Sequence, residues 1–241
     1  MTKTFVLIHG SWHGGWAWQA VVRHLEAKGH RAYAPTLPGH EPGADRAGLT
    51  HQDYVDTVVS YIKQHDLHDV NLVGHNSFGG SVISRVVEYL PDRSQRLIFL
   101  DGFFPADNQS VHEILPNAFT ELLSQFAQAS PDNTFLIPWE IWRNNLIQDA
   151  PEEVARLTWE HLSPEPYQTI LEKLDLKAFY SLDIPKSYIA CRQDLSMPPS
   201  FFHPGMSSRL GTYKLIEMDG SHEVLFTRAA EVADKLIQAS E

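Results

Sequence analysis

The sequence predicts an α/β fold in which a mostly parallel sheet carries helices on both faces. Short apolar runs alternate with longer runs of helical periodicity, as such sheets require. The alternation stops over residues 104–177 and then resumes, which predicts an inserted segment. The chain has 241 residues, which is enough for one such domain with a sizeable core.

The amino-terminal third of the chain predicts two strands with a helix between them. Residues 5–8 are continuously apolar, as in a strand buried on both faces. Residues 16–27 have amphipathic spacing, and Gly29 is the expected terminator of that helix. Residues 31–34 form a weaker strand that the proline-rich turn 35–39 closes.

The next third continues the same alternation up to an acidic residue. Helical spacing marks residues 52–65, and a buried strand follows at 70–74. A glycine-rich turn then leads into a helix over 81–90. The strand at 97–100 ends at Asp101.

The segment 104–177 lacks β-branched runs, so we expect a mostly helical lid. It follows a strand end, and an insertion there would cover the carboxyl edge of the sheet, where such sheets bind ligands. The predicted core is therefore 1–103 and 178–241. It is completed by two strands and a closing helix, over residues 187–191, 213–218 and 227–239.

Composition limits the partners and the location of the protein. The formal net charge of −11 opposes binding to nucleic acid or to anionic membranes. Cys191 is the single cysteine, so no internal disulfide can form. No apolar run reaches membrane-spanning length, and the early strand at 5–8 leaves no room for a signal peptide. We expect a cytoplasmic protein that binds a small molecule, with a homodimer as the one assembly considered.

Three residues that follow strand ends occur in the order serine, acid, histidine. They are Ser77, Asp194 and His222. A serine hydroxyl is a weak nucleophile that needs an adjacent base, and the histidine needs an acid to fix its tautomer. Carboxyl ends of parallel strands meet at one sheet edge, so folding can bring the three together. Asp101 also ends a strand and is the rival acid.

An oxyanion intermediate needs two hydrogen-bond donors near the serine. We assign the backbone N–H groups of Ser11, in the loop after the first strand, and of Phe78, which follows Ser77. His9 and His13 are four residues apart in the same loop, but their loop-like setting argues against a metal pair. Phosphate-binding glycine motifs are absent, so no nucleotide cofactor is expected.

The chain resembles the α/β-hydrolase branch that holds plant methylesterases, hydroxynitrile lyases and bacterial esterase relatives. The resemblance implies an inserted helical lid, a Ser–His–Asp triad and no cofactor. We place Gly10 and Trp12 beside the substrate, and Trp139 and Trp142 either beside it or in the packing of the lid. The matching segments span nearly the whole chain, at residues 9–16, 74–80, 101–103, Asp194 and 220–223.

Two positions favour esterase over lyase within that branch. The lyases resemble one another in having a threonine where this chain has Gly10, and a lysine where it has Glu223. A lysine would stabilise a departing cyanide, and a glutamate would oppose it.

Asn76 departs from the branch's usual Gly-His-Ser-x-Gly-Gly pattern because it is an extra residue before Ser77. Counted from the strand, Asn76 takes the nucleophile position; counted from the helix, Ser77 keeps it. We favour the helix-side register and expect a bulged strand end at 74–76. The Asn76 side chain should lie near the pocket or form a hydrogen bond with neighbouring backbone.

The sequence therefore predicts a carboxylic ester hydrolase that acts on a small, largely apolar ester through an acyl-enzyme. Two alternatives stay open. One is lyase-like or other carbon–carbon chemistry on the same triad. The other is a ligand-binding protein whose active turn is disabled.

Overall fold

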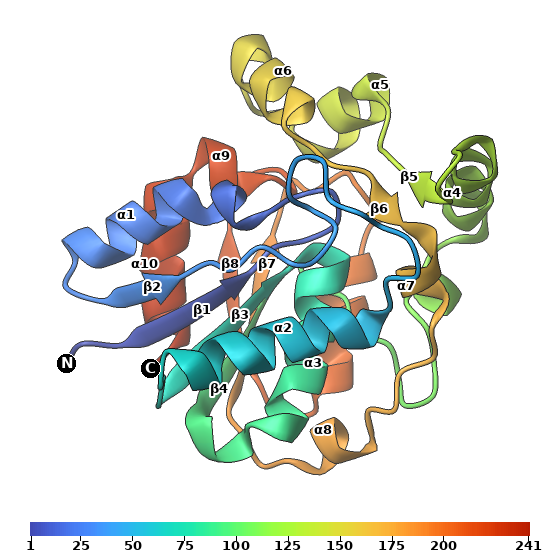
Figure 1. Cartoon of the computed structure of the whole chain (residues 1–241). Coiled ribbons are helices and arrows are strands. Elements are labelled where there is room, and N and C mark those ends of the chain that lie inside the picture. The colour runs from blue at the N-terminus through green and yellow to red at the C-terminus, as the bar shows by residue number, and fades with distance from the viewer.

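A six-stranded sheet with the order β2-β1-β3-β4-β7-β8 forms the centre of the protein (Figure 1). The computed structural model describes all residues except the side chain of Ser77. Each neighbouring pair of strands in this sheet is parallel. The strands are β1 Thr4–Ile8, β2 Arg31–Tyr33, β3 Val70–His75, β4 Ser94–Leu100, β7 Lys186–Cys191 and β8 Lys214–Met218.

Two helical layers cover the sheet because its strands carry apolar side chains on both faces. In β1, Val6 and Ile8 join one buried cluster, while Phe5 and Leu7 join the other, as the two-residue period of a strand requires. One layer contains α1 Gln19–Ala27, α9 Val224–Thr227 and α10 Ala229–Ala239, and the other contains α2 His51–Gln64, α3 Asn76–Tyr89 and α8 Lys177–Ser181.

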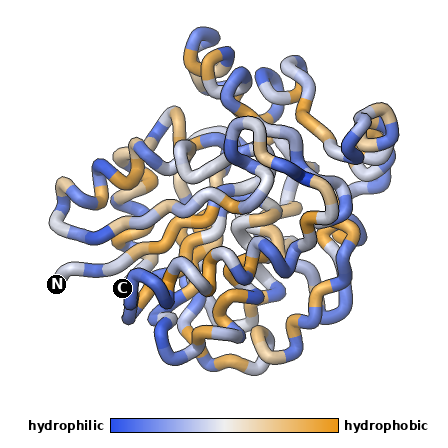
Figure 2. Tube along the Cα trace, in the orientation of Figure 1, coloured by the Kyte–Doolittle hydropathy of each residue, from blue (hydrophilic) through white to orange (hydrophobic). Residues whose placement is uncertain are grey.

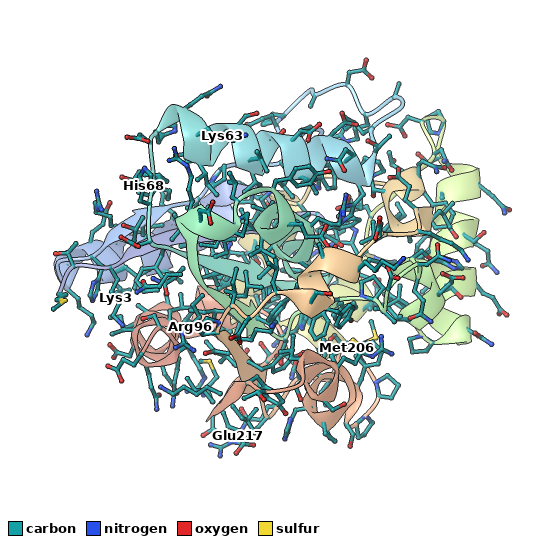
Figure 3. All side chains as sticks on the ribbon, turned by 90° about the horizontal axis from the view of Figure 1, so that it is seen from below. Lys3, Lys63, His68, Arg96, Met206 and Glu217 are labelled. Atoms are coloured by element: carbon teal, nitrogen blue, oxygen red, sulfur yellow. The ribbon has the colours of Figure 1, made fainter. Side chains whose placement is uncertain are left out.

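Apolar residues concentrate along the strands and on the inner sides of the helices, and hydrophilic residues follow the outer turns (Figure 2). Seen from below, Lys63 on α2 and Glu217 on the edge strand β8 lie at opposite outer sides of the molecule (Figure 3). Among the described residues, no helix is both long enough and apolar enough to cross a membrane.

The inserted segment forms a cap at one end of the sheet (Figure 1). The cap is mostly helical, and it also contains two short strands, β5 and β6, that pair antiparallel in a small second sheet. Strands of two residues fall below what a periodicity argument can detect. The cap elements are α4 Asn117–Ala129, β5 Thr134–Phe135, α5 Trp139–Ile141, a π-helical turn Trp142–Leu146, α6 Glu152–Glu160, β6 Glu165–Pro166 and α7 Tyr167–Leu171.

Candidate active site

The turn from β3 into α3 is fixed by a close approach of two glycines. A side chain on Gly74 would lie 2.1 Å from the carbonyl oxygen of Gly79, so both positions require glycine. Between them, Asn76 has a left-handed backbone with φ of 60°. Asparagine tolerates this conformation better than most residues. The sharpest part of the turn therefore falls on Asn76, the first residue of α3.

The strand end at 74–76 is not bulged, contrary to our expectation. Gly74 pairs in register with Ile8 of β1 and with Phe99 of β4, and His75 pairs with Leu100. The extra residue is instead accommodated within the turn, because the glycine contact fixes both of its ends. Asn76 lines the pocket, as expected, whereas the side chain of Ser77 lies outside the described residues.

His222 and Asp194 form a buried pair at the carboxyl edge of the sheet. His222 Nδ1 donates to Asp194 Oδ2 over 2.5 Å, and both side chains are almost fully buried, with exposures of 1% and 2%. The N–H of Ser196 donates to the other carboxylate oxygen over 2.7 Å. The hydroxyl of Ser196 lies 3.3 Å from His222 Nδ1. Sequence reasoning missed Ser196, although its position two residues after the acid was a signal.

Asp101 lies beside this pair in a different protonation environment. Burial, and then the charge of Asp194, raise the pKa of Asp101 well above its usual value. Burial also acts to raise the pKa of Asp194, but the charge and hydrogen bond of His222 outweigh it and lower that pKa. The oxygens of Asp101 accept the N–H of Cys191 at 3.2 Å. The surroundings therefore favour the charged form of Asp194 and the protonated form of Asp101.

His75 holds the loop that carries His222. Its Nε2 donates to the backbone carbonyl oxygen of His222 over 3.0 Å, and the two rings lie 5.1 Å apart. The branch's pattern has a histidine at this place in the chain, but nothing in the sequence indicates that it contacts a loop 147 residues away.

The loop after β1 presents Ser11 and Trp12 to the pocket. His9 Nδ1 donates to the Gly10 carbonyl over 2.9 Å, and His13 Nδ1 donates to the Ser11 carbonyl over 2.7 Å. These bonds fix the peptide that contains the Ser11 N–H and the peptide that follows it. They also explain both histidines as loop anchors.

Phe78, the second predicted donor residue, turns its ring into the core. That ring packs edge-on against Tyr54 at 5.4 Å. The backbone N–H of Phe78, the donor predicted from the sequence, lies in the first turn of α3. Among the described residues, one group of side chains has atoms of metal-ligand type that all lie within 4.8 Å of one another. It consists of Asp101, Asp194 and His222, which are discussed above.

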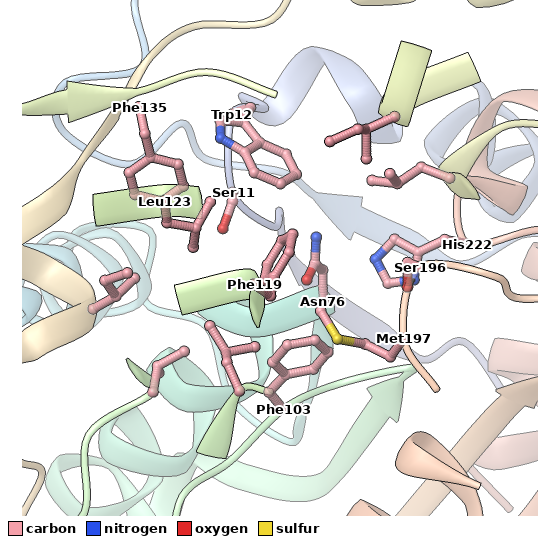
Figure 4. Close-up of a pocket in the computed structure, with 15 residues that line it drawn as sticks. Ser11, Trp12, Asn76, Phe103, Phe119, Leu123, Phe135, Ser196, Met197 and His222 are labelled. Carbon is pink, nitrogen blue, oxygen red and sulfur yellow. Dashed lines mark hydrogen bonds between the residues drawn. The ribbon is translucent and has the colours of Figure 1, made fainter. Parts of the chain in front are cut away.

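A mostly apolar pocket lies between these loops and the cap (Figure 4). Its polar lining consists of Ser11, Asn76, Ser196 and His222. In Figure 4, Asn76 lies between Ser11 and the ring of His222, with the Met197 side chain below it. The apolar lining is Trp12, Phe103, Val111, Leu115, Phe119, Leu123, Phe135, Ile141, Leu146, Ile170 and Met197.

Trp139 and Trp142 are not among the described residues that line this pocket, which corrects one of the two expectations for them. Trp142 is fully buried, and its Nε1 donates to the Ala155 carbonyl over 3.0 Å. Trp139 packs against Trp159 and under the guanidinium of Arg156, 3.6 Å from its ring centre. Both indoles pack the cap, and their neighbours Ile141 and Leu146 line the pocket instead.

Gly10 and Glu223, the two positions that separate the branches, have clear structural settings. A side chain on Gly10 would lie 2.5 Å from Cβ of Asn76, so the loop has no room for a threonine there. Glu223 is fully buried, and its carboxylate lies 3.5 Å from His13 Nε2. Burial raises the pKa of Glu223 to about 8. Glu223 is not among the described pocket-lining residues, so its charge does not act there as we had expected.

Comparison with known proteins identifies the fold and the branch. A model described as "Alpha/beta hydrolase family" matches residues 5–235. The chain belongs to the alpha/beta hydrolase family. It is 30% identical to the carbendazim hydrolyzing esterase of Nocardioides sp. (strain SG-4G), with 96% of this chain and 97% of that one covered. It is 27% identical to salicylic acid-binding protein 2 of Nicotiana tabacum, with 98% and 96% covered.

A solved structure agrees with this assignment. An extracellular alpha/beta-hydrolase from a Paenibacillus species superposes with a TM-score of 0.94 at 39% identity, over 98% of each chain. Its description reports structural and functional homology to the tobacco protein. This member of the family is a serine hydrolase of the branch that holds plant methylesterases, hydroxynitrile lyases and bacterial esterases.

Proposed function

We propose that the protein hydrolyses small, largely apolar carboxylic esters with Ser77 as nucleophile, His222 as base and Asp194 as the orienting acid. The observation that carries this proposal is the 2.5 Å contact between His222 and Asp194. The ring of His222 lines an apolar pocket at the turn where Ser77 follows Asn76. An imidazole paired with a carboxylate is the arrangement that activates a serine hydroxyl.

The reaction proceeds in two balanced halves. His222 takes the hydroxyl proton as Ser77 attacks the ester carbonyl, and the Ser11 and Phe78 N–H groups stabilise the oxyanion. The proton passes to the departing alcohol, which leaves an acyl-enzyme. Water then attacks the acyl group, giving its proton to His222, and the acid leaves as Ser77 regains its proton.

The pocket and the relatives support the substrate class. Apolar side chains dominate the lining, so an uncharged acyl or alkyl group would bury its surface there. The Nocardioides and Arabidopsis relatives are named as an esterase and a methylesterase. A cytoplasmic location and a homodimer stay predictions.

Two features oppose the lyase alternative. The crowding at Gly10 leaves no room for the lyases' threonine hydroxyl. The residue after the triad histidine, Glu223, contacts His13 instead of the pocket. A measurement of esterase activity distinguishes the esterase from the other alternative, a binding protein whose active turn is disabled.

The deciding experiment combines hydrolysis of p-nitrophenyl acetate with labelling by a serine-directed fluorophosphonate. We expect the wild-type protein to hydrolyse the ester and to carry the label on Ser77. Ser77→Ala should lose both, whereas Ser84→Ala should keep both. Ser84 is a matched control because its hydroxyl, on the same helix, donates to the Gly80 carbonyl.

Labelling of Ser196→Ala tests the other hydroxyl near His222. Loss of labelling in that variant, with Ser77→Ala still labelled, would transfer the nucleophile role to Ser196. A folded wild-type protein that neither hydrolyses the ester nor takes the label would favour the disabled binding protein.

A further inference from the structure

We propose that Glu165, in the cap, is a positioning residue for the oxyanion loop. The proposal rests on the proposed function, because it concerns the loop that supplies the Ser11 donor. Glu165 is fully buried in β6. Its Oε2 accepts the backbone N–H of Trp12 over 3.2 Å. A cap side chain thus directly holds the peptide that joins Ser11 to Trp12.

The cap holds both sides of Trp12. The Trp12 carbonyl oxygen accepts the N–H of Ser163 over 2.8 Å and lies 3.2 Å from the Ser163 hydroxyl, which also donates to it. Phe135, on the paired strand β5, packs edge-on against the Trp12 indole with ring centres 6.0 Å apart. The loop conformation is therefore shared between core and cap.

Trp12 needs such support because its backbone is left-handed, with φ of 69°. A bulky residue in this region is strained and persists only where its surroundings impose it. The Ser11–Trp12 peptide is bonded to the Cα of Ser11, so a rotation of the Trp12 backbone would shift Ser11 and with it the Ser11 N–H. The contacts from Glu165 and Ser163 oppose this rotation.

Glu165 is itself held by two core residues. Its Oε2 lies 2.9 Å from His40 Nε2, and its Oε1 accepts the Tyr54 hydroxyl over 2.8 Å. Burial lowers the pKa of His40, but the Glu165 charge and hydrogen bonds outweigh it and raise that pKa overall. The carboxylate has its oxygens satisfied by Trp12, His40 and Tyr54, so it is a rigid acceptor for the loop.

The chemistry of the side chain gives a test by rank order. Glu165→Gln keeps an oxygen at the same reach and can still accept from Trp12, although it loses the charge that pairs with His40. Glu165→Asp keeps a negative charge beside His40, but its carboxylate is one methylene shorter and loses the direct contacts of Oε2 with Trp12 and His40. A role in charge pairing alone would rank Asp above Gln, whereas a positioning role ranks Gln above Asp.

We expect Glu165→Asp and Glu165→Ala to lower kcat for p-nitrophenyl acetate by about 10²–10³, the effect of losing one oxyanion donor. Their KM should change by less than about threefold, since the loss is specific to the transition state. Glu165→Gln should keep kcat within about threefold while its Tm falls, because His40 loses its charged partner. Trp159→Phe is the matched control: it removes the cap hydrogen bond from Trp159 Nε1 to the Ile137 carbonyl, which involves neither Glu165 nor Trp12. It should lower Tm and leave kcat unchanged.

Hydrogen exchange of the Trp12 amide measures its contact with Glu165 independently of catalytic activity. Its protection should fall at least about tenfold in Glu165→Asp and persist in Glu165→Gln and Trp159→Phe. A folded Glu165→Asp with unchanged kcat and unchanged protection overturns the proposal, as does an equal fall of kcat in Trp159→Phe. A wild-type protein without esterase activity would contradict the proposed function, while the exchange ranking would still decide the role of Glu165.

Discussion

Asp101 and Asp194 are neighbouring buried carboxyl groups whose pKa values are shifted in opposite directions. Burial and the nearby Asp194 charge raise the pKa of Asp101. Burial also acts to raise the pKa of Asp194, but the charge and hydrogen bond of His222 outweigh it and lower that pKa. Two like charges this close in a buried site are unfavourable, so one group stays protonated. The one that contacts His222 Nδ1 keeps the charge.

This difference predicts unequal effects of two isosteric substitutions. Asp194→Asn should lower kcat by about 10⁴, because an amide leaves His222 in the wrong tautomer. Asp101→Asn should lower it by less than about tenfold, since a neutral carboxyl is replaced by a neutral amide that can still accept the Cys191 N–H. Steady-state kinetics on the two purified variants make the comparison. The reverse ranking would assign the acid role to Asp101.

The His222–Asp194 pair predicts a pH profile shifted to the alkaline side. Burial lowers the pKa of His222, but the charge and hydrogen bond of Asp194 outweigh it and raise it to about 9. A general base must be neutral, so kcat/KM should rise with pH and level off above about 9. If kcat/KM instead levels off below pH 6.5, the ordinary pKa of histidine, Asp194 does not raise the pKa of His222.

The same pair predicts the opposite trend for stability. A folded-state pKa above the unfolded value means that the folded state binds the proton more tightly. The contribution of His222 to stability is therefore complete below its ordinary pKa of about 6.5 and is lost as pH rises through about 9. Thermal unfolding of the wild-type protein across this range should show a falling Tm, and His222→Gln should show a flatter dependence.

Asn76 predicts the outcome of restoring the branch's usual turn. Deleting Asn76 should leave esterase activity equal or higher, because Gly74 and Gly79 can still meet over a turn shorter by one residue. Asn76→Gly is the matched control, since glycine keeps the left-handed backbone and removes only the side chain. Kinetics and circular dichroism on both variants give the answer. A folded deletion variant without activity would make Asn76 part of the mechanism.

Phe119 and Trp139 predict which aromatic residues of the cap control substrate size. Both are partly buried, but Phe119 lines the pocket and Trp139 packs against Arg156. Phe119→Ala should raise the kcat/KM ratio of octanoate to acetate p-nitrophenyl esters by about tenfold or more, as added methylenes find space. Trp139→Ala should lower Tm and keep the ratio. An equal change of the ratio in both variants would show that the pocket does not extend along α4.

The sequence by itself determined the sheet, the order of its strands along the chain and the acid–base pair. Its apolar runs have the length and period of buried strands, so β1, β3 and β7 lie within one residue of their predicted bounds. Asp194 and His222 follow strand ends, and parallel strands bring such ends to one edge. Local periodicity and topology were sufficient for both results.

Only the tertiary structure decided how the turn at Asn76 is built and which cap residues face the pocket. Gly74 lies against Gly79, and Gly10 lies against Asn76. The hydrophobic periodicity of the sequence does not predict either contact. The contacts of Glu165 with Trp12 and of His75 with His222 span 153 and 147 residues. Such contacts depend on packing between layers, and a chain read residue by residue carries no local signal of them.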